Sequence, residues 1–255
     1  MPAISVVIIT FNEEKNIKRC IESVLPIADE IVVVDSFSND KTKEIATGFK
    51  IVKFVEHAFV GHIEQKNYAI TCATYPHILS LDADEALNSE LLESVKQTKN
   101  NWNADGYSFN RLTNYCGKWI KHGGWYPDAK LRLWDSRKGA WGGTNPHDMF
   151  IMNADSKLAH LSGDLLHYSF YTINQHVQQG NKFSDIRANA LFKKGKKANV
   201  FHLLIKPSWK FFHQLVLKLG FLDGMYGWII AINSAHVKFQ VYSKLWQMHK
   251  EQKNK

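Results

Sequence analysis

The stretch Ile78-Leu79-Ser80-Leu81-Asp82-Ala83-Asp84-Glu85 begins as a short apolar run and ends in carboxylates. The apolar run predicts a buried strand, and the carboxylates predict a polar site at the end of that strand. Two earlier runs share this design: Ile4 to Thr10 leads into Phe11-Asn12-Glu13-Glu14, and Ile31 to Val34 leads into Asp35. Ligands of open α/β sheets bind beyond the carboxyl ends of the strands. These runs therefore predict an α/β fold with its site at that edge.

The first hundred residues alternate predicted strands with predicted helices. Beyond the three runs above, the pattern predicts helices from Glu13 or Glu14 to Val24, from about Lys41, and from Ile63 to Ala73, and a strand from Ile51 to Val55. Such an order predicts a mostly parallel sheet with right-handed crossovers.

After Asn100 the pattern changes. It predicts short strands at 106–111, 130–134 and 165–168, a loop at 142–148, a helix from Thr172 to about Phe192, and further helices to about Gln247 with breaks near Pro207 and from Gly220 to Gly227.

Asp82 and Asp84 form an Asp-x-Asp pattern, which we take as the chemical centre. Mg²⁺ or Mn²⁺ is commonly held by one or two carboxylates together with substrate phosphates. The alternative is a turn whose acids only precede a helix starting at Asn88 or Ser89. Because the chain has neither a Gly-x-Gly-x-x-Gly after the first strand nor a Gly-x-x-x-x-Gly-Lys-Ser/Thr, the phosphates of a nucleotide ligand would need such a metal.

The chain length of 255 residues allows one large α/β domain, or one domain with an appendage, and 45% hydrophobic residues suffice for a core. Cys20, Cys72 and Cys116 are scattered, which argues against a disulfide framework or a zinc cluster and favours a reducing compartment. The first apolar run is too short for a signal peptide.

The net charge of +8 is concentrated at the carboxyl end. From Lys193 to Lys255 there are twelve Lys and no Arg against Asp223 and Glu251, so this segment carries +10 and the rest of the chain −2. The segment is also rich in aromatic and aliphatic residues, a combination that favours the surface of an anionic membrane over nucleic acid. The absence of Arg also counts against nucleic acid.

No stretch reaches the roughly twenty apolar residues that span a bilayer. We therefore expect these helices to lie on or partly in a membrane surface. Alternatively, they pack against the rest of the protein or against a second copy, as a homodimer.

The motifs together resemble the family 2 glycosyltransferases of the GT-A fold, and among them the lipopolysaccharide-core glycosyltransferases of the WaaE/KdtX type. The resemblance covers nearly the whole chain, and the order and spacing of its motifs are more specific than any one of them. It is carried by residues 5–14, by Ile31 to Asp40, by Gln65-Lys66-Asn67, by Leu79 to Glu85, by Gly124 to Asp128, by Leu131-Arg132-Leu133, by Leu166 to Ser169 and by Leu219 to Gly224.

The resemblance implies a GT-A catalytic domain at 1–190, with a nucleotide-sugar half at 1–100 and an acceptor half at 101–190, and a basic amphipathic helical extension at 191–255. It implies an inverting hexosyltransferase that moves a sugar from a nucleotide donor, usually a UDP-sugar, to an acceptor hydroxyl. The acceptor would be a lipopolysaccharide core or another lipid-linked saccharide, at the cytoplasmic face of the membrane, with the enzyme cytoplasmic and peripherally bound.

The resemblance also assigns residues. Thr10, Asn12 and Glu13 would lie along the nucleotide, Asp35 would contact the base, and Lys66 would approach the nucleotide or its phosphates. Asp82 would approach the ribose and the metal, and Asp84 would ligate the metal, Mg²⁺ or Mn²⁺, that bridges the diphosphate.

Inverting transfer needs a base that deprotonates the acceptor hydroxyl. The family places an acid after a His in a late loop, which here is His147-Asp148, so Asp148 is the expected base; Asp128 is the first substitute and Glu85 a weaker one.

Four further side chains each have a functional and a structural interpretation. Arg132 would lie near phosphate or acceptor unless it pairs with a surface acid, and His167 would be a third metal ligand unless it packs in the core. Trp125 and Tyr126 would stack on a sugar unless they are core residues.

Three alternatives stay open. A polyprenyl-phosphate sugar synthase would use the same donor site with a phosphate acceptor and no essential base. A non-catalytic, membrane-attached nucleotide-sugar-binding scaffold would keep its membrane or partner binding when Asp84 is replaced. A nucleic-acid-binding protein would use the basic tail, with binding that weakens steeply with salt.

Overall fold

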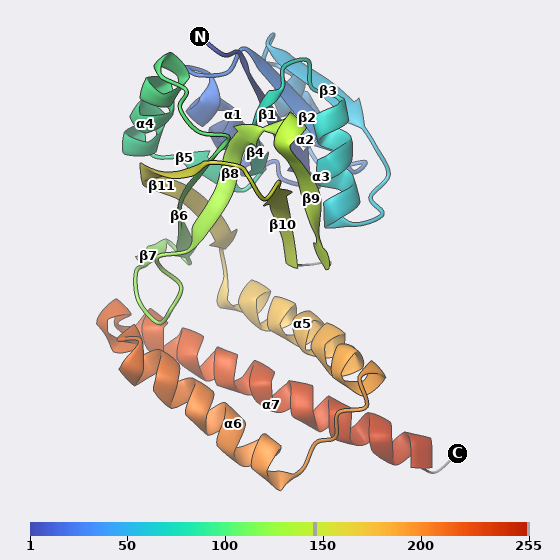
Figure 1. Cartoon of the computed structure of the whole chain (residues 1–255). Coiled ribbons are helices and arrows are strands. Elements are labelled where there is room, and N and C mark those ends of the chain that lie inside the picture. Colours follow the sequence, from blue (N-terminus) through green and yellow to red (C-terminus); the bar gives the residue numbers. More distant parts are fainter. Residues whose placement is uncertain (145–146, 254–255) are drawn as a thin grey trace. The chain divides into compact units, whose positions relative to one another are not determined.

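A computed structural model describes residues 1–144 and 147–253. The chain divides into two compact units, whose elements are drawn in Figure 1. Unit 1 comprises residues 1–112 and 128–168, and unit 2 comprises residues 113–127 and 169–255. The domain boundary that we expected at residue 190 falls inside helix α5 (Ile173–Lys193).

The amino-terminal half of unit 1 is a parallel sheet with the strand order β3-β2-β1-β4. The strands are β1 (Ile4–Thr10), β2 (Glu30–Asp35), β3 (Val52–Glu56) and β4 (His77–Asp82). The connecting helices are α1 (Ile17–Val24), α2 (Thr42–Thr47) and α3 (His62–Thr71). The predicted strands and helices of this half are confirmed, with bounds that move by at most four residues.

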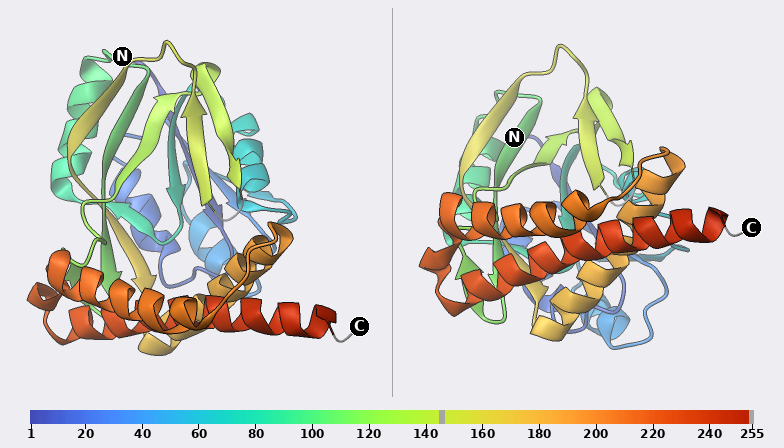
Figure 2. Two further views of the ribbon diagram at one scale, coloured as in Figure 1. Left: turned by 60° about the horizontal axis from the view of Figure 1, so that its bottom comes forward. Right: turned by 90° about the horizontal axis from the view of Figure 1, so that it is seen from below.

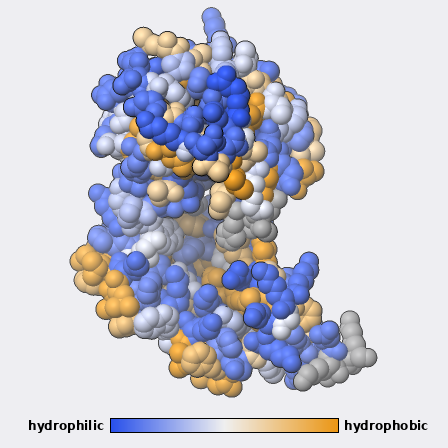
Figure 3. Space-filling view, in the orientation of Figure 1, coloured by the Kyte–Doolittle hydropathy of each residue, from blue (hydrophilic) through white to orange (hydrophobic). Residues whose placement is uncertain are grey.

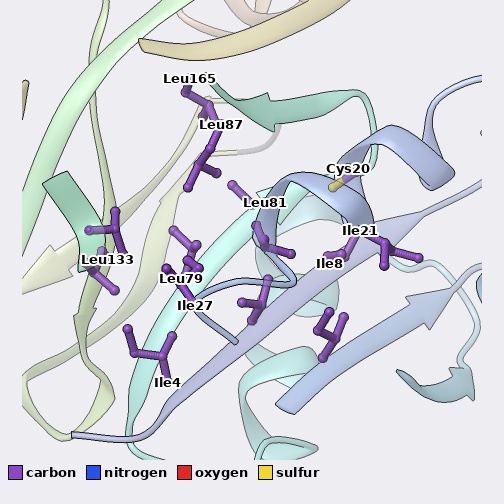
Figure 4. Close-up of a cluster of buried hydrophobic side chains, with 14 of the residues drawn as sticks. Ile4, Ile8, Cys20, Ile21, Ile27, Leu79, Leu81, Leu87, Leu133 and Leu165 are labelled. Carbon is purple, nitrogen blue, oxygen red and sulfur yellow. The ribbon is translucent and has the colours of Figure 1, made fainter. Parts of the chain in front are cut away.

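The main core of unit 1 forms where α1 packs against the sheet. Helix α1 buries Ile17, Cys20, Ile21 and Val24, which recur at helical spacing. Figure 4 shows Cys20 and Ile21 of α1 close to the aliphatic side chains of β1 and β4. Because these strands are buried, they read in the sequence as continuous apolar runs.

The rest of the sheet corrects the expectation of a mostly parallel arrangement. Strand β8 (Ala129–Asp135) pairs antiparallel with β4, β6 (Gly106–Tyr115) pairs antiparallel with β8, and the order continues through β11 (Leu158–Phe170) to β5 (Glu85–Leu87). With β7 (Lys118–Ile120) beside β6, the described residues form one mixed sheet of nine strands. Helix α4 (Ser89–Asn100) begins after Asn88, whose side chain accepts a hydrogen bond from Leu91 N.

The expectation of a loop at 142–148 is wrong for the described part of that range. The chain there contributes to a two-stranded antiparallel sheet of β9 (Gly139–Thr144) and β10 (His147–Met152), after the 3₁₀ turn η1 (Ser136–Lys138). The hairpin is held by aromatic packing: Phe150 stacks on Trp134 of β8 at 4.0 Å between centroids, and Trp141 meets both rings edge-on. The hairpin fixes the backbone of Asp148 opposite Gly143.

Unit 2 contains three long helices, α5, α6 (Val200–Phe212) and α7 (Met225–Lys253), in its described part. Helix α7 packs on both α5 and α6, and Figure 2 shows α6 and α7 side by side. A π-helical turn η2 (His213–Leu217) and a 3₁₀ turn η3 (Gly220–Asp223) connect α6 to α7. The predicted break near Gly220 to Gly227 is confirmed, whereas the break near Pro207 is wrong, because Pro207 lies inside α6.

In the described residues, no helix combines the length and the apolar character that crossing a bilayer demands.

Candidate active site

Three of the predicted site residues meet at the carboxyl edge of the parallel strands. Thr10 at the end of β1 pairs with Asp35 at the end of β2, and Ile9 pairs with Asp82 at the end of β4. The hydroxyl of Thr10 is buried, and no described residue makes a hydrogen bond to it. The register of the three strands thus brings a free hydroxyl and two carboxylates to one edge.

The segments that follow β1 and β2 bind each other. The Asn12 backbone N–H donates to Ser38 Oγ at 2.8 Å, and Asn12 Oδ1 accepts from Asn39 N at 2.9 Å. Asn12 has a φ of 55°, a left-handed conformation that asparagine tolerates. The carboxylate of Asp35 accepts hydrogen bonds from both the backbone and the hydroxyl of Ser38. Asn12 and Asp35 therefore shape the rim of the site by joining the segments that follow β1 and β2.

Lys66 joins two of the predicted residues. Its Nζ lies 2.8 Å from Asp148 Oδ2 and 3.0 Å from Asp82 Oδ1, and the Lys66 side chain is only 4% exposed. Arg132 approaches Asp82 from the other side, with a nitrogen 3.1 Å from Oδ2. Burial alone would raise the pKa of Asp82, but the charges of Lys66 and Arg132 hold it far below its ordinary value. Asp82 is thus a permanent carboxylate.

The same network continues through Glu85 and Asp128, the two substitute bases, and through Arg111, which the sequence did not single out. Arg132 donates to Glu85 Oε1 at 2.8 Å, and Arg111 lies 3.7 Å from that oxygen and donates to Asp128 at 2.8 Å. Charges of opposite sign therefore alternate along one line, which we call the charged chain: Asp148, Lys66, Asp82, Arg132, Glu85, Arg111 and Asp128.

The position of Asp128 bears on its role as the substitute base. Burial raises its pKa, but hydrogen bonds and charges from Lys130 and Arg111 lower it more, so the net pKa is lowered. A carboxylate held ionised by two cations is a weak proton acceptor at neutral pH. Glu85, the weaker substitute, is fully buried between two arginines and also accepts a hydrogen bond from Asp82 N at 3.0 Å. Both residues are better placed to orient the neighbouring Arg132 and Arg111 than to remove a proton.

Asp84 faces a different partner. Its Oδ2 lies 3.1 Å from His167 Nε2 on β11, next to the end of β4. Burial lowers the pKa of His167, but the charge of Asp84, its hydrogen bond and the charge of Glu85 together outweigh burial, so the net pKa is raised. No group of three or more His, Cys, Asp and Glu residues in the described part of the chain is close enough to form a complete protein metal site.

The donor atoms nevertheless suit a hard cation that also takes oxygens from its ligand. Lys66 Nζ is not in hydrogen-bonding geometry with Asp82 Oδ1, and this buried oxygen accepts no hydrogen bond from any described residue. Asp84 is 23% exposed and adds carboxylate oxygens two residues away. Mg²⁺ usually takes only one or two protein carboxylates and completes its shell with phosphate and water.

Glu13 is a third acid close to this end of the site. Burial raises its pKa to about 7; the hydrogen bond from Asn16 opposes this, and the charges of Asp84 and Asp40 add to it. Its backbone N–H donates to Thr42 Oγ1 at 2.8 Å, which ties the start of α1 to α2.

The Gln65-Lys66-Asn67 motif of α3 has a separate contact for each residue. Gln65 is fully buried and donates to Ser36 Oγ at 3.2 Å. Asn67 binds the backbone of Trp141 in β9 twice, donating to its carbonyl at 3.0 Å and accepting from its N–H at 3.1 Å. The Trp141 ring lies 4.5 Å from Lys66 Nζ, in cation–π geometry. The motif therefore connects the Ser36 loop, the carboxylates and the hairpin that carries Asp148.

The remaining predicted residues are Trp125, Tyr126 and His147. Trp125 belongs to unit 2, where its ring packs against Tyr115, Phe170 and His176. This is the core role that we set against sugar stacking; Tyr126 is also in unit 2. The side chain of His147 lies outside the described residues.

Comparison with known proteins identifies a family for this chain. The model of glycosyl transferase family 2 matches residues 5–198. A glycosyltransferase of Rickettsia typhi, itself uncharacterized, is 32% identical over 265 residues, which cover 100% of this chain and 90% of that protein. The lipopolysaccharide core biosynthesis glycosyltransferase LpsC of Rhizobium meliloti is 27% identical over 262 residues, covering 96% and 93%.

The fold agrees with a solved structure as well. Residues 1–349 of S. aureus TarS, crystallised in complex with UDP, superpose with a TM-score of 0.50 at 14% identity over 98% of this chain and 92% of that one. The fold and the strand-end site define a glycosyltransferase of the GT-A class. The chain belongs to glycosyl transferase family 2, which confirms the resemblance in its sequence motifs.

Proposed function

We propose that this enzyme transfers a sugar, with inversion, from a nucleoside diphosphate donor to a hydroxyl of a lipopolysaccharide-core or other lipid-linked saccharide at the cytoplasmic face of the membrane. The observation that carries the proposal is the strand-end site itself. There Asp82 presents an oxygen without a hydrogen bond, Asp84 follows two residues later with a partly exposed carboxylate, and Lys66 connects Asp82 to Asp148. The LpsC name supports the acceptor class, and the TarS complex makes UDP the first nucleotide to test.

In this proposal the donor lies across the carboxyl ends of β1, β2 and β4. Thr10 offers its unpartnered hydroxyl to the nucleotide, while Asn12, Glu13 and Asp35 line the rim. Asp84, with Asp82 Oδ1, would hold Mg²⁺ or Mn²⁺, which would neutralise the charge that develops on the leaving diphosphate. Lys66 and Arg132 keep Asp82 ionised and add positive charge beside the phosphates.

Asp148 is the proposed base. Its carboxylate is 13% exposed, on a hairpin that Asn67 fixes to α3, and its present partner is Lys66. A lysine that moves toward the donor phosphates would leave this carboxylate free to accept the proton of the acceptor hydroxyl. Asp128 lacks this freedom, because Arg111 and Lys130 both hold it.

The donor site is tested by thermal unfolding of the whole protein with a panel of nucleotides and nucleotide sugars, each with and without Mn²⁺ or Mg²⁺. A ligand that binds only the folded state raises the unfolding temperature. We expect one nucleoside diphosphate to stabilise the protein only when metal is present, and Asp84→Ala to abolish this shift. Asp155→Ala, which removes an exposed acid of unit 1, is the matched control and should keep it.

The acceptor is tested next with the donor so identified. Transfer of a labelled sugar to lipopolysaccharide core fragments, but not to polyprenyl phosphate, is expected, and Asp148→Asn should lower turnover while the nucleotide and metal still stabilise the protein. Stabilisation by no nucleotide in the panel would contradict the donor site. Transfer to polyprenyl phosphate alone would replace the acceptor class.

A further inference from the structure

Helix α6 of unit 2 carries many apolar side chains but buries none of its residues. Phe201, Leu204, Ile205 and Trp209 each expose more than half of their surface. The apolar surface continues over the two turns that follow, where Leu217 and Leu222 also expose more than half. Figure 3 shows hydrophobic residues on the surface, with hydrophilic residues between them. Exposed apolar side chains gathered along one helix and the turns after it mark contact with a membrane or another protein.

A groove of about 500 Å³ lies within this surface, between α6 and α7. Phe201, Ile205 and Trp209 give it an apolar lining. No Asp or Glu is among the residues that line it.

The polar lining of the same groove is cationic. Lys206 and Lys210 come from α6 and Lys238 from α7, with His213 of η2 close by. In the described part of the chain no carboxylate forms an ion pair with these three lysines. Lys206 Nζ instead lies 5.4 Å from the Tyr242 ring. The groove therefore combines uncompensated positive charge with an apolar lining.

The lysines of the groove also affect one another. Burial lowers the pKa of Lys210, and the charge of Lys238 lowers it further. An anion between the two ammonium groups would relieve this repulsion and form charge-assisted hydrogen bonds.

We propose that the α6–α7 groove binds the phosphate headgroup of an anionic phospholipid, with the acyl chains against the exposed apolar side chains of α6. This inference deepens the membrane-surface part of the proposed function and rests on it. The apolar lining favours a lipid over nucleic acid, whose backbone offers anionic groups without acyl chains. A symmetric contact with a second copy would bring two sets of unpaired lysines together, so the same face is poorly suited to a homodimer.

The test is binding of the 255-residue chain to vesicles of phosphatidylcholine alone and of phosphatidylcholine with phosphatidylglycerol, measured by co-sedimentation. We expect binding to the anionic vesicles only. The double variant Lys210→Gln/Lys238→Gln should weaken it on the order of thirty-fold, because each lysine near an anionic surface contributes about a factor of five. Lys182→Gln/Lys193→Gln removes the same charge from exposed positions on α5 and should weaken binding no more than about five-fold.

Two further measurements separate the occupants. Trp209→Ala should weaken vesicle binding several-fold, because it removes part of the apolar lining. For the same reason, soluble short-chain phosphatidylglycerol should bind the wild-type protein more tightly than inorganic phosphate does. Equal losses in the two double variants would show diffuse attraction and overturn the groove site. A dimer in light scattering that Trp209→Ala dissociates, with vesicle binding unchanged, would assign the face to a second copy.

This assay needs neither a donor nor turnover. If vesicle binding fails while the nucleotide and metal still stabilise the protein, the lipid site alone is wrong. If vesicle binding holds and no nucleotide stabilises the protein, the donor site is wrong and the lipid site stands.

Discussion

At the scale of single residues, the charged chain explains how so many ionised groups remain inside unit 1. A buried charge is tolerated only when it is paired and hydrogen-bonded, and removing one partner leaves the other uncompensated. Glu85 is the central case, since its side chain is fully buried and both Arg132 and Arg111 approach Oε1. Its contribution is therefore to hold two cations in place behind Asp82.

Glu85→Gln keeps the shape of this side chain but removes its charge. We expect the free energy of unfolding, measured with urea, to fall by about 3 kcal/mol, because Arg132 and Arg111 lose their shared counter-ion. Glu93→Gln is the control: its side chain is 59% exposed and its ion pair with Lys96 is long at 3.9 Å, so the change should stay within about 0.5 kcal/mol. A Glu85→Gln protein as stable as wild type would mean that Asp82 alone satisfies Arg132.

Glu13 makes stability depend on pH. Burial raises its pKa from 4.5 to about 7, so between these values the folded protein holds a proton that the unfolded chain releases. Stability is therefore expected to fall as pH rises through this window, by at most about 3 kcal/mol. Urea unfolding of the metal-free protein from pH 4.5 to 8 should show the free energy of unfolding of Glu13→Gln rising relative to that of wild type as pH rises. Glu22→Gln, on the exposed surface of α1, is the control and should show the same pH dependence as wild type. If Glu13→Gln also showed that same pH dependence, the raised pKa of Glu13 would be refuted.

At the scale of elements, α3 acts as a brace between the sheet and the β9–β10 hairpin. The two hydrogen bonds from Asn67 hold the backbone of Trp141, and the opposite strand carries Asp148. The position of the proposed base is thus set by a helix that lies about eighty residues earlier in the sequence.

Asn67→Ala tests this brace. It leaves both backbone groups of Trp141 without their partner, which should lower the free energy of unfolding by about 1–3 kcal/mol. If Asp148 is the base, turnover should fall roughly ten- to hundred-fold, because small displacements of a reacting group are costly, while calorimetry should find donor affinity little changed. Thr71→Ala, at an exposed end of the same helix, should leave both unchanged. Full turnover in Asn67→Ala would separate the hairpin from catalysis.

The strands that the sequence indicates most directly are those whose burial is continuous. Strands β1, β2 and β4 are nearly fully buried, so their apolar runs could be recognised without the structure. The β9–β10 hairpin could not, because its Gly-rich strand reads as a loop and its stability comes from Trp134, Trp141 and Phe150 packing together. Strand β5 has three residues and pairs with β11, about eighty residues later, so its local pattern is too short to indicate a strand.

Most, but not all, residues of the charged chain could be predicted from the sequence. Lys66, Asp82, Arg132 and Asp148 were singled out, and the structure brings all four into one network. Arg111 was missed because a charged residue in an alternating strand normally faces solvent. Its partners Glu85 and Asp128 lie on other segments, so the pairing is decided by the tertiary fold rather than by spacing.

At the scale of the whole molecule, the two units differ sharply in charge. Unit 2 has sixteen Lys and Arg against three Asp and Glu, a formal charge of +13, and unit 1 has sixteen against twenty-one, a charge of −5. A negative catalytic unit does not attract a nucleoside diphosphate sugar by its net charge, so donor binding depends on the local cations and the proposed metal. Unit 2 carries the excess positive charge that would attract the enzyme to an anionic surface.

Salt should therefore separate the two functions. Raising NaCl from 50 mM to 500 mM shortens the screening length to about 4 Å, which weakens contacts of exposed lysines far more than the partly buried ion pairs of the strand-end site. We expect binding to anionic vesicles, and transfer to an acceptor embedded in them, to fall more than about ten-fold. Stabilisation by nucleotide and metal, and transfer to a water-soluble acceptor fragment, should change by less than about three-fold. Sucrose at matched osmolality is the control and should affect neither reaction. If both transfer reactions fell together, the charge of unit 2 would be acting on the catalytic step itself, and the division of roles between a donor-binding unit and a membrane-binding unit would be wrong.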